Sequence, residues 1–209
     1  MLFAQIQFIA SLKQWRHLLA RKGKAYRTKE LSSAGVKHIP NRVDIEERPA
    51  FVDEKIQVGH WEADTVYGQD GYFVTLVERV TKLLVVGRTK SKKEVSNAIK
   101  EMMMPFQSIC HSITFNNGGE FAGHEDIKKH LKCDTFFAKP YHSWQRGLNE
   151  NTNGPLRRFF PKGMKIAGIS DKRIKDVEFL INMRPRKTLN YLNPFESLKG
   201  YRVSVIVEI

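Results

Sequence analysis

GHWEADTVYG, residues 59–68, opens a series of three short runs that decide the fold. YFVTLVERV (72–80) and LLVVGRT (83–89) follow it, and only QDG and TK separate the three runs. Each run is rich in β-branched and aromatic residues, a pattern typical of sequential antiparallel strands. Next, SKKEVSNAIKEMMMPF (91–106) has a serine start and helical apolar spacing, which predict an amphipathic helix that ends near Pro105.

Two more strands and several helices are predicted downstream. ITFNNGGEF (113–121) begins as a fourth strand and stops at two amides and two glycines. HEDIKKHLK (124–132) predicts a short helix, and DTFFAKP (134–140) a fifth strand. Helices over about residues 146–160 and through DKRIKDVEFLINM (171–183) follow. This order predicts an α/β domain with a mixed five-stranded sheet and flanking helices.

The composition indicates a basic protein with a polyanionic partner. Lys and Arg total 35 against 22 Asp and Glu, which gives a net charge of +13. Neutralising phosphates releases counterions, so this excess favours nucleic acid, although charge alone does not separate DNA, RNA and anionic lipid. Cys110 and Cys133 form no disulfide framework, which predicts a reduced, cytoplasmic protein, and no run approaches the length of a membrane span.

Differences in composition and hydrophobic periodicity divide the chain into two parts. Residues 1–48 are predicted to be a basic helix and linker, poor in periodicity and punctuated by Gly and Pro. Residues 55–200 carry the strand and helix patterns of the α/β domain. The first part is expected to be a remnant of an upstream DNA-binding region once the resemblance described below is taken into account.

Asp64 is the first candidate for a functional site. Aspartate is depleted inside strands, yet Asp64 lies in the middle of the first one, and alternation places it on the same face as Glu62 and Val66. A carboxylate on a rigid strand can hold a metal, but an aspartate near a strand end can equally cap a turn.

Glu150 is the second candidate. If its segment is helical, Glu150 shares a face with Arg146, Asn153 and Arg157. On spacing alone it is either a functional carboxylate or a solvated partner of these basic residues.

Three positions share a recognisable spacing: Asp64, position 116 at the end of the fourth strand, and Glu150. Thirty-three residues (117–149) separate the last two. This set resembles the D, D, E constellation of the retroviral-integrase and transposase superfamily, which has a ribonuclease-H-like fold. The segments GHWEADTV, TFNNGGEFAGH, PYHSWQRGLNENTNG, RRFFPKG and NMRPRKTLNYLNPFE resemble, in order, the transposases of insertion-sequence family thirty. The resemblance covers about residues 15–198.

The resemblance implies a DNA transposase that cleaves insertion-sequence ends and transfers the strand into target DNA. It implies two Mg²⁺ or Mn²⁺ ions between carboxylates and the scissile phosphate. Asp64 would bridge both metals, Glu150 would hold one, and position 116 would supply a second Asp. The catalytic and metal-binding set is therefore Asp64, Asn116 and Glu150. A homo-oligomer on DNA, dimeric or larger, in the bacterial cytoplasm at the nucleoid is also implied.

Three departures from the family pattern predict impaired catalysis and weakened metal binding. Asn116 stands where the family has an Asp, and it lacks the negative charge and the option of bridging two metals. Pro155 stands where the family has an apolar residue, so the helix with Glu150 either is kinked or begins only near Thr152. The family match starts almost at once, which predicts an N-terminally truncated protein. The alternative function is a non-catalytic DNA-binding remnant that pairs with, or competes against, an intact transposase.

Basic and aromatic residues around and beyond Glu150 are predicted to track a DNA backbone, with solvated cations as the alternative. Phe159 and Phe160 are predicted to be core residues, and His60 and Trp61 to serve packing rather than catalysis. The predicted DNA-binding residues are Trp144, Arg146, Arg157, Arg158, Lys162, Lys165, Arg184, Arg186 and Lys187.

Overall fold

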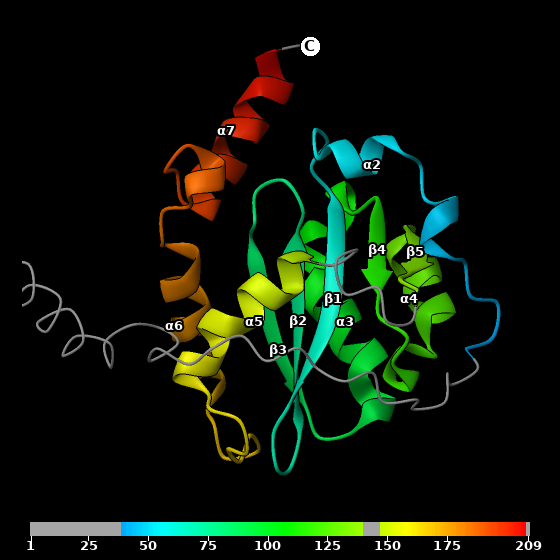
Figure 1. Cartoon of the computed structure of the whole chain (residues 1–209), viewed down its shortest axis with the longest axis vertical. Helices are drawn as coiled ribbons and strands as arrows, with labels where there is room; N and C mark the ends of the chain where they lie inside the picture. Colours follow the sequence, from blue (N-terminus) through cyan, green and yellow to red (C-terminus); the bar gives the residue numbers. More distant parts are fainter. Residues whose placement is uncertain (1–38, 140–146, 208–209) are drawn as a thin grey trace, which may run out of the picture. The chain divides into compact units, whose positions relative to one another are not determined.

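The computed structural model describes residues 39–139 and 147–207 (Figure 1), and it describes side chains in these ranges except at 147–152 and 202–207. The chain divides into two compact units, residues 1–34 and 35–209. All described residues belong to the second unit, which contains the sheet.

Five strands form one mixed sheet in the order β3-β2-β1-β4-β5. β1 pairs antiparallel with β2, and β2 antiparallel with β3, while β4 lies parallel to both β1 and β5. The prediction of three antiparallel strands followed by two crossover strands is confirmed. The strands are β1 (His60–Tyr67), β2 (Tyr72–Glu78), β3 (Leu84–Thr89), β4 (Ser112–Phe115) and β5 (Asp134–Phe137).

Helices cover both faces of the sheet, as the parallel crossovers require. Predicted helix bounds agree with the observed ones to within a few residues, and α3 ends at Met103, just before Pro105. The α-helices are α2 (Phe51–Glu54), α3 (Val95–Met103), α4 (His124–Leu131), α5 (Gly147–Phe159), α6 (Asp171–Asn182) and α7 (Pro194–Val207). Short 3₁₀ helices are η2 (Ile45–Glu47), η3 (Lys92–Glu94), η4 (Met104–Ile109), η5 (Gly119–Phe121) and η7 (Lys187–Leu189).

Alternation along β1 separates two hydrophobic cores. Trp61 and Ala63 belong to the core under α3 and α4, whereas Val66 belongs to the core under α5 and α6. Figure 1 shows α5 and α6 on one face of the sheet. Because successive side chains of a strand point to opposite faces, Asp64 lies on the α5 face with Val66. The predicted assignment of faces is confirmed for these residues.

Residues 39–48, predicted as the end of a linker, pack against the sheet. Ile39 and Ile45 are buried, and Asp44 forms a β-bridge with Phe137. Arg48 is 6% exposed and donates to Thr114 Oγ1 at 2.9 Å, so this segment is attached to β4. The domain fold therefore includes residues that the sequence assigns to the linker.

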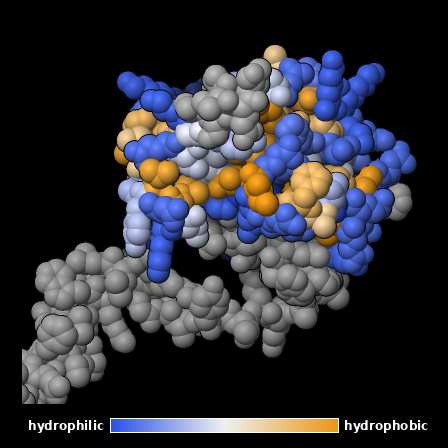
Figure 2. All heavy atoms as spheres, turned by 90° about the horizontal axis from the view of Figure 1, so that it is seen from above, coloured by the Kyte–Doolittle hydropathy of each residue, from blue (hydrophilic) through white to orange (hydrophobic). Residues whose placement is uncertain are grey.

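The outer surface of the C-terminal helices exposes several large apolar side chains. Figure 2 shows one face of the molecule, on which orange hydrophobic residues interrupt a mainly hydrophilic surface. None of the helices in the described ranges has the length and apolar character that crossing a membrane needs. The exposed apolar residues in this region include Phe179, Leu180, Met183, Tyr191, Leu192 and Phe195.

Candidate functional site

Asp64 accepts hydrogen bonds on both carboxylate oxygens. Oδ1 accepts from the backbone N–H of Thr65 at 2.9 Å and from Asn116 Nδ2 at 2.8 Å. Oδ2 accepts from Asn153 Nδ2 at 2.9 Å. The strand-end cap that the sequence left open is therefore only part of its role, because two side-chain amides from distant segments also converge on this carboxylate.

The parallel pairing of β1 with β4 brings Asn116 to Asp64. Glu62 is in register with Thr114, so two residues further along both strands Asp64 and position 116 come side by side. Asn116 Oδ1 accepts from the backbone N–H of Gly118 at 2.7 Å. That bond sets the orientation of the amide, with its oxygen toward the turn and its nitrogen toward Asp64.

The orientation of Asn116 decides what this position can bind. The carbonyl oxygen, the atom of Asn that can coordinate a metal, is held by Gly118, and an N–H points at Asp64 instead. Flipping the amide would leave the Gly118 N–H without this acceptor and would place two oxygens against each other. As oriented, Asn116 is a hydrogen-bond donor to the candidate site.

Asn153 on α5 is a site residue that sequence reasoning did not assign. Its Nδ2 donates to Asp64, and its Oδ1 lies 3.4 Å from Thr75 Oγ1 on β2. Position 153 was expected only to share a helical face with Glu150. The spacing of three residues from Glu150 was the signal that could have found it.

Glu150 lies in α5, but its side chain is outside the described residues. Asn153, three positions later on the same helix, contacts Asp64. Of the predicted DNA contacts, Trp144 and Arg146 also lie outside the described residues. Whether Glu150 completes the set stays a prediction.

α5 runs through Pro155. The helix begins at Gly147, in agreement with the predicted range of about 146–160, which excludes the alternative of a start near Thr152 that would have placed Pro155 in the first turn. Leu156 is buried, and Phe73 and Phe160 pack with ring centroids 4.7 Å apart. These apolar contacts against β2 hold the helix in place where the proline removes a helical hydrogen bond.

Glu120 does not stand in for the missing carboxylate. Its Oε1 accepts from Thr65 Oγ1 at 2.8 Å and from Tyr67 OH at 3.1 Å, and its Oε2 lies 3.9 Å from Lys92 Nζ. Thr65 is on the face of β1 opposite Asp64, so Glu120 is bound on the other side of the strand.

The described side chains do not fit a two-metal centre. Within the parts of the chain that the structure describes, no group of three His, Cys, Asp or Glu residues could hold a metal ion. Divalent Mg²⁺ requires oxygen ligands, whereas Asn116 and Asn153 both direct N–H groups at Asp64. As arranged, the Nδ2 groups of Asn116 and Asn153 donate to different oxygens of the Asp64 carboxylate.

The predicted DNA-binding cations fall into two groups. Arg157 donates to the backbone oxygen of Tyr67 at 2.9 Å, and Arg186 donates to that of Ile181 at 3.3 Å, so these two have intramolecular partners. Burial lowers the pKa of both guanidinium groups. The others are exposed on the end of α5 and the segments that follow α5 and α6: Arg158, Lys162, Lys165, Arg184 and Lys187.

The residues predicted to serve packing do so. Phe160 is buried and Phe159 packs against the same core, and Trp61 is 1% exposed. His60 is also buried, with Nδ1 at 2.8 Å from Ser112 Oγ. Burial, followed by the nearby His111, lowers the pKa of His60 to about 4, so its ring is neutral at neutral pH.

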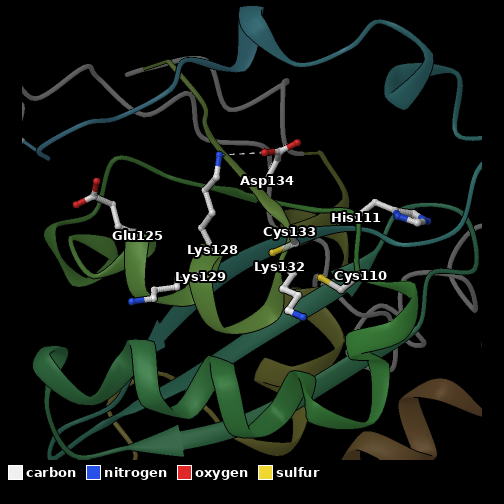
Figure 3. A pocket seen from close by; sticks show the side chains of 8 residues that line it. All are labelled: Cys110, His111, Glu125, Lys128, Lys129, Lys132, Cys133 and Asp134. Carbon is white, nitrogen blue, oxygen red and sulfur yellow. Dashed lines mark hydrogen bonds and ion pairs between the residues drawn. The ribbon is translucent and has the colours of Figure 1, made fainter.

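A cavity of about 740 Å³ lies away from this site (Figure 3). Cys110 and Cys133, both buried thiols, line it where β4 and β5 begin, whereas Asn116 follows the other end of β4. Figure 3 shows the ion pair between Lys128 and Asp134 at its edge. The remaining lining residues are His111, Glu125, Lys129 and Lys132.

Sequence comparison finds transposases. No family model matches the chain. It is 40% identical over 185 residues to the transposase for insertion sequence element IS4351 of Bacteroides fragilis, covering 87% of this chain and 57% of that protein. It is 34% identical over 169 residues to transposase InsI for IS30A of Escherichia coli K12, covering 79% and 44%. The chain spans about half the length of the curated relatives it matches.

Structure comparison finds retroviral integrases. A chain of the simian T-cell lymphotropic virus intasome, in complex with a PP2A regulatory subunit, matches with a TM-score of 0.55 and 16% identity over 67% of this chain and 54% of that one. The catalytic core domain of BIV integrase matches with a TM-score of 0.52 and 14% identity over 70% and 98%. The fold is therefore the ribonuclease-H-like fold of integrase cores, as predicted.

Proposed function

This chain is related by sequence to the transposases of the IS30 family, and we propose that it is the catalytic core region of a DNA transposase with impaired chemistry. The reaction is cleavage of insertion-sequence ends and transfer of the strand into target DNA. The observation that carries the proposal is the meeting of Asp64 and position 116 between β1 and β4, under the helix that contains Glu150.

Phosphoryl transfer leaves the protein mainly the tasks of positioning and charge stabilisation. Asp64 and, by resemblance, Glu150 would hold divalent metal ions, which would supply activation of the attacking oxygen and stabilisation of the leaving oxygen. In this chain Asp64 is held rigidly on a central strand, which suits that task, whereas Asn116 contributes an N–H and no charge. If about 3–5 kcal/mol of transition-state stabilisation depends on a carboxylate at 116, the rate falls roughly 10²- to 10⁴-fold.

The proposed partner is DNA. The net charge of +13 gives a general attraction to phosphates, and the exposed Arg158, Lys162 and Lys165 lie at and after the end of α5. We propose that Arg157, unlike these three, holds α5 against the end of β1 rather than contacting phosphate, because its guanidinium donates to the Tyr67 backbone oxygen. Binding through such contacts is expected to weaken steeply with salt.

A second candidate function is supported by the same amides. Asn116 places an N–H rather than a carboxylate against Asp64, and Asn153 donates to the other oxygen, an arrangement that favours a protein that binds DNA without processing it. Such a protein would pair with, or compete against, an intact transposase. The two candidates differ in whether restoring a carboxylate at position 116 restores chemistry.

The test is metal-dependent strand cleavage and joining on pre-nicked DNA, comparing the chain with Asn116→Asp. Asn117→Asp is a matched control, because Asn117 contacts Arg42 and the Ala138 carbonyl rather than Asp64. The substitution therefore adds the same negative charge outside the candidate site. We expect a gain of orders of magnitude for Asn116→Asp alone, abolished by Glu150→Gln in that background. Equal activity of the unaltered chain and Asn116→Asp would show that position 116 is not part of the reacting site.

A further inference from the structure

Tyr67 at the end of β1 is an exposed aromatic residue that is held in place on several sides. The residue is 48% exposed, although most of β1 is buried. Its hydroxyl donates to Glu120 Oε1 at 3.1 Å, and its ring meets that of Tyr72 edge-on with centroids 5.2 Å apart. Lys92 Nζ lies 5.8 Å from the ring centroid.

The exposed part of Tyr67 is its ring rather than its hydroxyl. Glu120, which accepts the hydroxyl proton, is only 4% exposed and also accepts from Thr65. Burial, and the charge of Glu120, raise the pKa of Tyr67, so the phenol remains a neutral donor. A fixed aromatic ring loses little conformational entropy when a flat ligand stacks on it.

The ring lies on the face of β1 opposite Asp64, where Thr65 and Tyr67 both donate to Glu120. Tyr67 is three residues beyond Asp64 on the same strand, a rise of roughly 10 Å. β4 ends before this point, so the end of β1 projects past the β1–β4 pairing. Arg157 of α5 donates to the Tyr67 carbonyl oxygen, so the backbone at this position, rather than the ring, is bound to the helix that also carries Asn153.

A cation accompanies the ring. The Lys92 side chain is 42% exposed and lies 3.9 Å from the buried Glu120 carboxylate, which orients it over Tyr67. Lys90 and Lys93 on either side are also exposed. An aromatic ring beside an oriented lysine is the combination that binds an unpaired nucleotide, with the base on the ring and the phosphate at the cation.

We propose that Tyr67 and Lys92 form a subsite for one unpaired nucleotide of bound DNA at the exposed end of β1, on the face of the strand opposite Asp64. The inference rests on the proposed function, because it takes the DNA substrate as given. It adds a preference for DNA that carries a single-stranded overhang, since a base inside a duplex cannot stack on a protein ring without leaving its own stack.

The test compares the binding of the chain to a random-sequence duplex with and without a short single-stranded overhang. Fluorescence anisotropy gives both affinities, and 2-aminopurine in the overhang reports stacking directly. We expect Tyr67→Leu to weaken overhang binding about 5- to 150-fold, the range for losing one stacked base, and to leave blunt duplex binding unchanged. Tyr67→Phe keeps the ring, so it should retain the overhang preference and the 2-aminopurine signal.

Two controls separate stacking from a structural role. Tyr191→Leu removes another tyrosine, 71% exposed in the segment after α6, and should have no effect on the overhang preference. Thermal unfolding of each variant reports its folding. Lys92→Gln should weaken overhang binding and reduce its salt dependence.

The outcomes distinguish this inference from the proposed function. Salt-dependent binding of blunt duplex with no preference for the overhang would refute the subsite and leave the proposed function intact. Equal losses in Tyr67→Leu and Tyr67→Phe would assign the effect to the hydroxyl and Glu120, which also refutes it. Binding to neither DNA would overturn both proposals.

Discussion

Asn116→Asp is expected to destabilise the protein when divalent metal is removed. The change replaces an N–H that donates to Asp64 at 2.8 Å with a carboxylate oxygen facing another carboxylate. Two unit charges about 4 Å apart repel by about 1 kcal/mol in water and about 4 kcal/mol at an effective dielectric constant near 20. A hydrogen bond of about 1–2 kcal/mol is lost as well. Because both residues are only partly buried, we expect a total loss of about 2–5 kcal/mol.

Thermal unfolding in EDTA, followed by titration with Mn²⁺ or Mg²⁺, measures this effect. For a domain of this size each kcal/mol moves Tm by about 2–4 °C, so the variant should melt roughly 5–15 °C lower. A metal bound only by the folded state restores about 2.7 kcal/mol at a concentration of 100 times its Kd. The unaltered chain and Asn117→Asp should show little response to the metal.

The pH dependence of the stability of Asn116→Asp provides an independent test of the repulsion between residues 64 and 116. Two adjacent carboxylates raise the pKa at which the pair takes up its first proton in the folded state above the unfolded value. The destabilisation is therefore fully present above that raised folded pKa and disappears as the pH falls to the unfolded value. If Asn116→Asp melts like the unaltered chain in EDTA, and metal does not raise its Tm, the placement of position 116 against Asp64 is wrong.

Three further changes test the fold around the site. Pro155→Ala should stabilise the chain by up to about 3 kcal/mol in urea unfolding, because the proline lies inside α5; a loss would mean that the helix needs it. Gly59→Ala should cost about 2–4 kcal/mol, since Gly59 has φ of +111° and a Cβ there would overlap the Ile109 carbonyl oxygen. Gly154→Ala, with open space around it, is its control and should not destabilise. His60→Gln should remove a stability loss that appears as the pH falls from the ordinary histidine pKa of 6.5 to the lowered folded pKa of about 4. Over that window the unfolded histidine takes up a proton before the buried one does, and an unchanged slope would assign the loss to other groups.

Most of the fold follows from local patterns. The runs before residue 90 predict three antiparallel strands because β-branched and aromatic residues alternate between short polar breaks, and the register confirms this. Asp64 and position 116 could be predicted to meet from the family resemblance, and the parallel pairing supplies the physical reason. Local patterns succeed here because each strand is buried on at least one face and so carries its own signal.

The long-range side-chain hydrogen bonds at and near the site could not be predicted in the same way. Asn153 reaches Asp64 across 89 positions of sequence, and Tyr67 reaches Glu120 across 53. Neither pair leaves a periodic signal, because a single polar contact depends on how a helix or loop is seated on the sheet. At Pro155 helix propensity left a kinked helix and a late start as alternatives, and the observed helix runs through the proline with Leu156 and Phe160 packed against the sheet.

The turn after β4 explains why an asparagine is stable at position 116. Gly118 N–H needs an acceptor from residue 116, which the side chain of either Asn or Asp can supply. The second polar atom of that side chain then faces Asp64. An Asp would place an oxygen there and require a cation or a shared proton between the two carboxylates, whereas Asn places an N–H there and requires neither. Under the proposed function, an asparagine at position 116 would remove a metal ligand together with the charge repulsion that the metal offsets, so the fold would not depend on the metal.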